Sequence, residues 1–294
     1  MKFTGHNIQL NNGEQTRPGN QLLADSAFMT AIKRTVINIT GTDKEQYSEL
    51  KLVDLACMEG GYATEFATMG FTTLGIDARK DNLLKANYVK LNNKITNLNF
   101  VLDDVRNLPK YGQFDITLCL GILYHLDAPA DFLKMLYKQT NKLLIIHTFY
   151  APKKDIAYSF ASAIHKIKRL FVKKPKGEQL NKKLGLTEEV RKCTTTYIQH
   201  VKSYRLGPLT QNEGYAGRWY REWDKKSDKK KIEDKTEASY NNHRSFWLCK
   251  KDIIKALYDA GFSSVYEQLD DIDDLASKNP KKYYGRTMLV AAKN

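Results

Sequence analysis

The sequence predicts an α/β fold built on a doubly wound parallel sheet of seven strands. Short apolar runs alternate with stretches of helical periodicity over about residues 50–150, and the alternation resumes near residue 250. A strand, a glycine turn and a helix stand in that order at its start, and acidic residues recur where the next predicted strands end. Strands that alternate with helices of this length imply a parallel sheet covered on both faces.

The individual elements follow from the spacing of apolar residues. A turn-rich lead precedes a helix predicted over 21–40, where apolar residues recur at helical spacing. Core strands are predicted at 50–56, 72–77, 98–104, 114–121 and 142–149, with helices at 78–93 and 128–140. A helix over 250–262 and two closing strands at 263–269 and 286–293 complete the sheet.

The formal net charge of +14 is concentrated in one segment. Residues 151–245 hold 23 basic and 11 acidic side chains, whereas residues 1–150 hold 16 and 15, and residues 246–294 hold 8 and 7. Because this segment has few β-rich runs and two or three helical patches, we expect a mainly helical, basic insertion after strand five. The predicted units are an N-terminal lead and helix (1–45), a core (46–150), the insertion (151–245) and the completion of the core (246–294).

Composition excludes several classes. No run of eighteen apolar residues predicts a spanning helix, and the N-terminus lacks an apolar signal core, so a cytoplasmic protein is expected. The four cysteines show no CxxC spacing, so reduced thiols and no metal site are expected.

The side chains predicted to bind a ligand lie at the carboxyl ends of the strands. Strand one ends at Asp54, and the glycine turn at 60–61 lets backbone N–H groups approach a ligand at a helix N-terminus. Strand two ends at Asp77, about twenty residues beyond the turn, which is the spacing of a ribose clamp. Strand three ends at Asp103 and Asp104, where a carboxylate can accept an adenine amino group, and we favour Asp104.

The order of these motifs resembles that of the class I S-adenosylmethionine-dependent methyltransferases, over about 50–150 and 246–294. Three pieces resemble the branch that includes tRNA wobble-uridine carboxymethyltransferases and many small-molecule methyltransferases: HNIQLNNGEQTRPG, EGGYATEFA and FDITLCLGILYHLDAP. The resemblance implies a Rossmann-like sheet with an antiparallel last strand, S-adenosylmethionine as the cofactor, S-adenosylhomocysteine as its product, and no metal.

The resemblance also implies which residues hold the cofactor. Its methionine end would lie over the turn after strand one, its ribose on Asp77, and its adenine beside Asp104 and Val105. The full predicted set is Asp54, Ala56, Glu59, Gly60, Asp77, Ala78, Asp104, Val105 and Leu120.

The turn departs from the family's D-x-G-x-G-x-G pattern. Ala56 and Met58 replace two of its three glycines, and Met58 is expected to point its side chain away from the ligand. A dehydrogenase needs the first two glycines for a pyrophosphate, which S-adenosylmethionine lacks. The departure therefore argues against a dinucleotide more than against methyl transfer.

Recognition of the acceptor is assigned mainly to the insertion. Arginines interleaved with aromatic residues in EGYAGRWYREW (213–223) and NNHRSFWL (241–248) suit an anionic acceptor, and ordinary packing of a cap explains them equally well. The predicted acceptor-binding residues are Tyr124, Tyr215, Arg218, Trp219 and Arg244. His147 and His243 are the candidate general bases, whereas His125 is interpreted as a structural residue of its turn.

The favoured function is methyl transfer to oxygen or nitrogen of a small-molecule or glycan-type metabolite. A tRNA-modifying methyl- or carboxymethyltransferase is the alternative, because the basic segment can track phosphates. A non-catalytic binding module is the third, although intact Asp77 and Asp104 positions argue against it. The apolar stripe over 155–174 fits a lid on the core, which we favour, or a helix on an anionic membrane surface. The choice between S-adenosylmethionine and its carboxylated analogue, and the oligomeric state, stay open.

Overall fold

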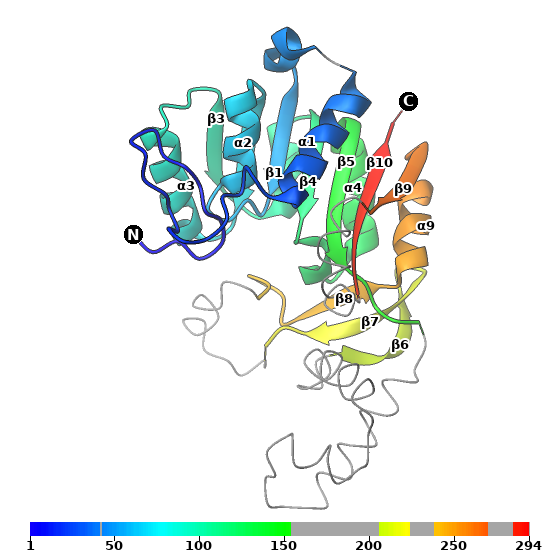
Figure 1. Cartoon of the computed structure of the whole chain (residues 1–294). Helices are drawn as coiled ribbons and strands as arrows, with labels where there is room; N and C mark the ends of the chain where they lie inside the picture. The colour runs from blue at the N-terminus through cyan, green and yellow to red at the C-terminus, as the bar shows by residue number, and fades with distance from the viewer. Residues whose placement is uncertain (42, 154–205, 224–237, 270–284, 294) are drawn as a thin grey trace, which may run out of the picture.

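The computed structural model describes residues 1–41, 43–153, 206–223, 238–269 and 285–293. It confirms the predicted fold class, with a seven-stranded sheet in the order β3-β2-β1-β4-β5-β10-β9 (Figure 1). Its strands are β1 (Lys51–Leu55), β2 (Thr72–Asp77), β3 (Leu98–Leu102), β4 (Phe114–Leu120), β5 (Thr140–Phe149), β9 (Ser264–Gln268) and β10 (Arg286–Ala292). The described α-helices are α1 (Ala27–Thr40), α2 (Gly61–Met69), α3 (Lys80–Asn92), α4 (Pro129–Gln139) and α9 (Lys250–Ala260). Short 3₁₀ helices are η1 (Lys44–Glu49), η2 (Val105–Tyr111) and η3 (Leu123–His125).

Strand β5 shows why both faces of the sheet are covered. Leu144 and Ile146 pack with α4 and α9, whereas Leu143 and Ile145 pack with α1 and α2, and all four are fully buried. Successive side chains of a strand point to opposite faces, so an uninterrupted apolar run needs a helical layer on each side. Figure 1 shows these two layers.

The end of the chain closes the sheet in the expected reversed sense. β10 lies between β5 and β9 and pairs antiparallel with both. The five core strands β1 to β5 pair parallel to one another. The predicted antiparallel last strand is therefore confirmed.

The described part of the insertion differs from the helical expectation. β6 (Leu206–Asn212), β7 (Tyr215–Arg221) and β8 (Arg244–Leu248) form an antiparallel three-stranded sheet beyond the carboxyl ends of the core strands (Figure 1). The aromatic residues of the two quoted motifs are strand-forming, because aromatic side chains fit a half-buried pleated surface. The predicted lid or membrane helix over 155–174 lies outside the described residues.

Three polar contacts fix this small sheet on the core. The Glu213 carboxylate at the β6–β7 turn accepts the backbone N–H groups of Ala130 (3.1 Å) and Asp131 (2.7 Å) at the start of α4. A carboxylate is favoured at a helix N-terminus, where backbone N–H groups lack helical partners. The Phe246 N–H donates to the Leu126 carbonyl at 2.7 Å. The sheet is thereby held next to the segment that follows β4.

Among the described residues, no helix is both long enough and apolar enough to cross a bilayer. The described cysteines, Cys57, Cys119 and Cys249, are buried free thiols.

The turn after β1 keeps a glycine-type backbone at the positions where glycine is replaced. Ala56 has φ 55° and Met58 has φ 51°, both left-handed, as does Gly60 at 77°. The left-handed conformation costs a residue with a Cβ roughly 1–2 kcal/mol. Ala56 and Met58 therefore retain the backbone geometry of a glycine turn, although both residues are strained in it.

Replacing Ala56 with Gly is expected to raise the free energy of unfolding by about 0.5–1 kcal/mol, because relief of strain exceeds the added entropy of the unfolded chain. Urea denaturation measures this. The matched control is Ala31→Gly in the right-handed α1, which should lose about 1 kcal/mol. Equal losses in both variants would contradict the strain at Ala56.

Candidate active site

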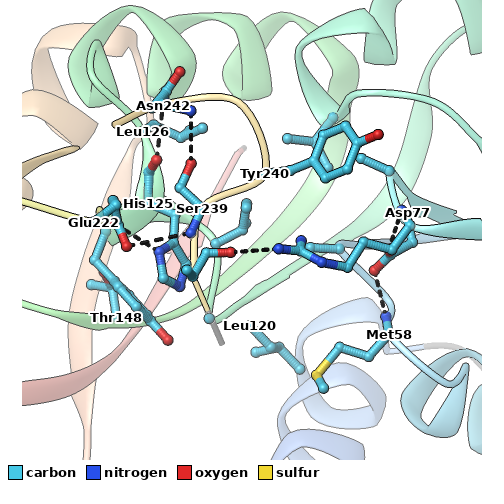
Figure 2. Close-up of a pocket in the computed structure, with 18 of the residues that line it drawn as sticks. Met58, Asp77, Leu120, His125, Leu126, Thr148, Glu222, Ser239, Tyr240 and Asn242 are labelled. Carbon is cyan, nitrogen blue, oxygen red and sulfur yellow. Dashed lines mark hydrogen bonds and ion pairs between the residues drawn. The ribbon is translucent and has the colours of Figure 1, made fainter. Parts of the chain in front are cut away.

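A cavity of about 850 Å³ lies between the carboxyl ends of the core strands and the small sheet. The carboxyl ends of β2, β4 and β5 and the segments that follow β1 to β4 contribute to its wall, as expected for a doubly wound sheet. Eight of the predicted site residues line it: Ala56, Asp77, Ala78, Asp104, Val105, Leu120, Tyr124 and His147. Figure 2 shows part of this wall.

Asp77 is a buried and rigid hydrogen-bond acceptor at the end of β2. One carboxylate oxygen accepts the Arg79 N–H at 2.8 Å and the Asn82 amide at 3.1 Å, and the other accepts the Met58 N–H at 2.9 Å. Burial raises the pKa of Asp77, while the same hydrogen bonds oppose the shift. The carboxylate thus joins the β1 turn to the start of α3 and faces the cavity.

Asp104, rather than Asp103, reaches the cavity. Its carboxylate pairs with Arg106 at 2.7 Å and accepts the Asn241 amide at 3.2 Å. Burial alone would raise the pKa of Asp104, but the hydrogen bonds from Arg106 and Asn241 lower it overall. Asp103 instead accepts hydrogen bonds from Asn107 and the Tyr111 hydroxyl, at 2.6 and 2.8 Å.

Three predicted cofactor residues do not line the cavity. Asp54 is 1% exposed, its Oδ2 has no partner among the described residues, and burial raises its pKa to about 8. Gly60 faces protein, because a Cβ there would stand 2.6 Å from Phe100. Glu59 is fully buried and accepts the backbone N–H groups of residues 4–6. Contacts within the protein therefore explain why a glycine stands at position 60 and a glutamate at position 59.

Glu59 holds the N-terminal segment beside the cavity, because it accepts the backbone N–H groups of residues 4–6. His6 lines the cavity, with its ring edge-on to Tyr62 at 4.9 Å, and burial lowers the pKa of His6 to about 4. Met58, which was expected to point away from a ligand, also forms part of the wall, with its thioether end against Gly5. His6 is the first residue of the motif HNIQLNNGEQTRPG, which was the sequence signal that could have identified it as a site residue.

The two predicted bases lie in different surroundings. His147 lines the cavity, edge-on to Phe28 at 4.9 Å, and burial with a further contribution from Arg286 lowers its pKa to about 4. His243 does not line the cavity. Its backbone carbonyl accepts the Glu222 N–H at 2.9 Å.

Four predicted acceptor-binding residues also lie away from the cavity. The Tyr215 hydroxyl donates to Asp259 at 2.7 Å. Arg218 is fully buried and donates to the carbonyls of Pro152 (2.9 Å) and Gly207 (3.1 Å). Trp219 and Arg244 stack on each other at 4.1 Å. Tyr215 and Trp219 pack the small sheet on the core, whereas these contacts of Arg218 and Arg244 lie within the insertion.

Tyr124, which was predicted, lies on the wall of the cavity together with three aromatic residues that the sequence did not single out. Trp247 stacks on Phe149 at 5.0 Å and on Tyr220 at 4.6 Å, and Tyr124 meets Phe149 edge-on at 4.8 Å. We call these four side chains the aromatic wall. Strand alternation was the missed signal, because neighbours such as Trp219 and Tyr220 point to opposite faces of β7.

A histidine–carboxylate pair also lies on the wall. His125 Nδ1 is 2.9 Å from Glu222 Oε1, and both residues line the cavity (Figure 2). The pair joins η3 of the core to the end of β7. Within the part of the chain that the structure describes, no group of three or more His, Cys, Asp or Glu residues is placed to hold a metal ion.

Comparisons with known proteins agree on one class. The model of the methyltransferase domain family matches residues 46–220. A ubiquinone biosynthesis O-methyltransferase of Rickettsia akari (strain Hartford) is 29% identical over 122 residues, or 40% of this chain and 48% of that protein. A tRNA U34 carboxymethyltransferase of Campylobacter lari is 27% identical over 161 residues, or 52% of this chain and 53% of that protein. The chain spans about half the length of these curated relatives.

Among solved structures, the N-terminal domain of EvdMO1 with S-adenosylhomocysteine (SAH) bound superposes with a TM-score of 0.59 at 18% identity. The match covers 97% of this chain and 92% of that one. At this identity the likeness concerns the fold.

Proposed function

Because the chain belongs to the methyltransferase domain family, whose model matches more than half of it, we propose that it transfers a methyl group from S-adenosylmethionine to a small-molecule or glycan-type acceptor. The observation that carries this proposal is the rigid Asp77 carboxylate in one cavity with Asp104. Both are acceptors at the ends of neighbouring strands, as a nucleoside requires.

The described residues fit this cofactor better than a dinucleotide. Asp77 with Ala78 would hold the ribose, and Asp104 with Val105 would hold the adenine. The unpartnered Asp54 Oδ2 lies buried below the turn that would receive the positively charged methionine end. Met58 lines the wall where a pyrophosphate needs glycine.

The bound cofactor supplies a sulfonium that gives up its methyl group by in-line displacement. The protein's part is to hold the acceptor atom in line and to exclude water, which can remove several kcal/mol from the barrier, of the order of 7–11 kcal/mol in the best cases. The aromatic wall and the small sheet cover the site on the acceptor side.

The shape and charge of the remaining cavity support a small acceptor. Its volume of about 850 Å³ is near the upper end of the roughly 300–1,000 Å³ typical of ligand pockets, which leaves room beside a nucleoside. Arg286 lines it and lies over the Phe149 ring at 4.1 Å. A guanidinium next to an aromatic wall suits a flat ring that carries an anionic group.

The acceptor class is tested with methyl-labelled S-adenosylmethionine. We expect label in a panel of hydroxylated aromatic and sugar acids, with matching formation of SAH, and none in bulk tRNA. Label in tRNA, together with tight and steeply salt-dependent tRNA binding, would contradict the small acceptor. A parallel assay with the carboxylated donor decides which cofactor is used. Absence of binding by either donor would contradict methyl transfer itself.

A further inference from the structure

We propose that the acceptor carries a hydroxyl group and that His125 is the base that takes its proton, with Glu222 as the positioning residue. This inference rests on the proposed methyl transfer. It assigns roles to two residues on the acceptor side of the cavity, where the proposed cofactor-binding residues do not lie.

The geometry of the pair leaves one ring nitrogen available. Glu222 Oε1 stands 2.9 Å from His125 Nδ1, which favours the tautomer with the hydrogen on Nδ1. Nε2 is then the acceptor, and it makes no hydrogen bond to a described residue. A base oriented in this way by a third group is the arrangement seen in nucleophile-activating sites.

Glu222 is itself held in place. Its side chain is 2% exposed, and Oε1 also accepts the Ser245 hydroxyl at 2.7 Å. Oε2 accepts the Ser239 N–H at 3.3 Å. Buried carboxylates need such partners. Glu222 and both serines belong to the insertion, whereas His125 belongs to the core, so docking of the small sheet brings the pair together.

The pair lies where an acceptor would meet the cofactor. His125 follows β4 closely, and Figure 2 shows it across the cavity from Asp77. Trp247 of the aromatic wall has a buried indole N–H with no partner among the described residues. An acceptor oxygen could receive that N–H, while the ring that carries it stacks on the wall.

The step balances without another reactant. The acceptor oxygen forms a bond to the methyl carbon as the carbon–sulfur bond breaks, and that electron pair stays on sulfur to give the neutral thioether. The acceptor's proton passes to His125 Nε2. Glu222 stabilises the resulting imidazolium, which later returns the proton to solvent.

Neighbouring charges do not provide a better base. η3 contacts β5, β8 and α4. β5 contributes His147, whose pKa burial lowers to about 4, too low for efficient base catalysis near neutrality. In β8, Arg244 lies over Trp219; in α4, Asp131 pairs with Lys134, and Lys138 lies in the last turn of the helix. Beside the pair on the chain, Asp127 lies 3.8 Å from Arg106, and the Tyr124 ring lies 4.3 Å from the His125 ring.

The experiment uses the full chain and three anionic probes: 3,4-dihydroxybenzoate, 4-aminobenzoate and glucuronate. We expect methyl transfer to the two hydroxyl probes, faster to the flat one, and none to the amine. His125→Asn keeps an N–H towards Glu222 but cannot take a proton. It should lose about 10²–10⁴-fold in kcat, with SAH binding unchanged.

The pH profile separates a base from a structural role. Wild-type kcat should rise with pH through one ionisation, because only a neutral imidazole can take the proton. Glu222→Gln removes a negative neighbour, so the midpoint should move to lower pH. His147→Ala should keep the rise.

Two results would overturn the assignment of the base. One is a His125→Asn variant that binds SAH and retains both the wild-type kcat and its rise with pH. The other is a Glu222→Gln profile that does not move. Transfer to 4-aminobenzoate alone would overturn the hydroxyl class. A wild-type chain that binds neither SAH nor donor would instead be a failure of the proposed function.

Discussion

Replacing Asp77 with Asn is expected to weaken SAH binding by at least about 100-fold. Two ribose hydroxyls donating to a charged acceptor contribute roughly 1.5–3 kcal/mol each, so their loss corresponds to about 10²–10⁴-fold in Kd. Asp77 is 4% exposed and its carboxylate is already fixed by Met58, Arg79 and Asn82, so it is preorganised for the ligand. Isothermal titration calorimetry measures the change.

Asp103→Asn is the matched control for this prediction. It makes the same substitution at the end of β3, where the side chain bonds Asn107 and Tyr111 and does not line the cavity. SAH binding should be nearly unaffected. Equal weakening in both variants would show a general loss of structure, and no weakening in Asp77→Asn would remove Asp77 as the ribose acceptor.

Replacing Glu59 with Ala is expected to lower the free energy of unfolding by about 3 kcal/mol or more, because three part-buried donors lose their acceptor at a cost of at least about 1 kcal/mol each. The carboxylate is fully buried and accepts the N–H groups of Thr4 (2.7 Å), Gly5 (2.9 Å) and His6 (3.3 Å). Lys85 lies 3.4 Å away. Urea denaturation measures the loss. Glu65→Ala, which removes the partly exposed pair with Lys33, should cost about 1 kcal/mol or less.

The pH dependence of this contribution has a definite sign. Burial would raise the pKa of Glu59, but the three backbone N–H groups and Lys85 outweigh it and lower the pKa overall. The stabilisation is therefore present above the carboxyl's ordinary pKa and is lost as the pH falls through the lowered value. Glu59→Gln should flatten that acid limb. An unchanged acid limb, or a loss no larger than that of Glu65→Ala, would contradict the role of Glu59 as the anchor of the N-terminal segment.

The core was predictable because each of its elements has a local signal. The continuous apolar run of β5 can satisfy both faces only in a sheet covered twice. Asp77 and Asp104 were accessible from spacing, since the carboxyl ends of parallel strands share one edge. Ala56 and Met58 looked like departures, yet their left-handed backbones retain the turn.

The acceptor side was not predictable in this way. His125 and Glu222 are 97 residues apart in sequence, and no local pattern joins them. Arg218 looked like a ligand for anions because arginine forks bind carboxylate and phosphate, but here it is fully buried against backbone carbonyls. The insertion was predicted to be mainly helical, so the alternation of side chains along β7, which points Tyr220 into the cavity, was missed. The packing of the small sheet on the core decides the positions of the His125–Glu222 pair, Arg218 and Tyr220.

We propose above all that this cavity is an S-adenosylmethionine site on a methyltransferase fold. Calorimetric titration of the full chain with SAH, and separately with NAD, tests it most directly. We expect saturable binding of SAH at a single site that Asp77→Asn weakens strongly, and no comparable binding of NAD. Tighter binding of NAD than of SAH, or SAH binding that Asp77→Asn leaves intact, would contradict it.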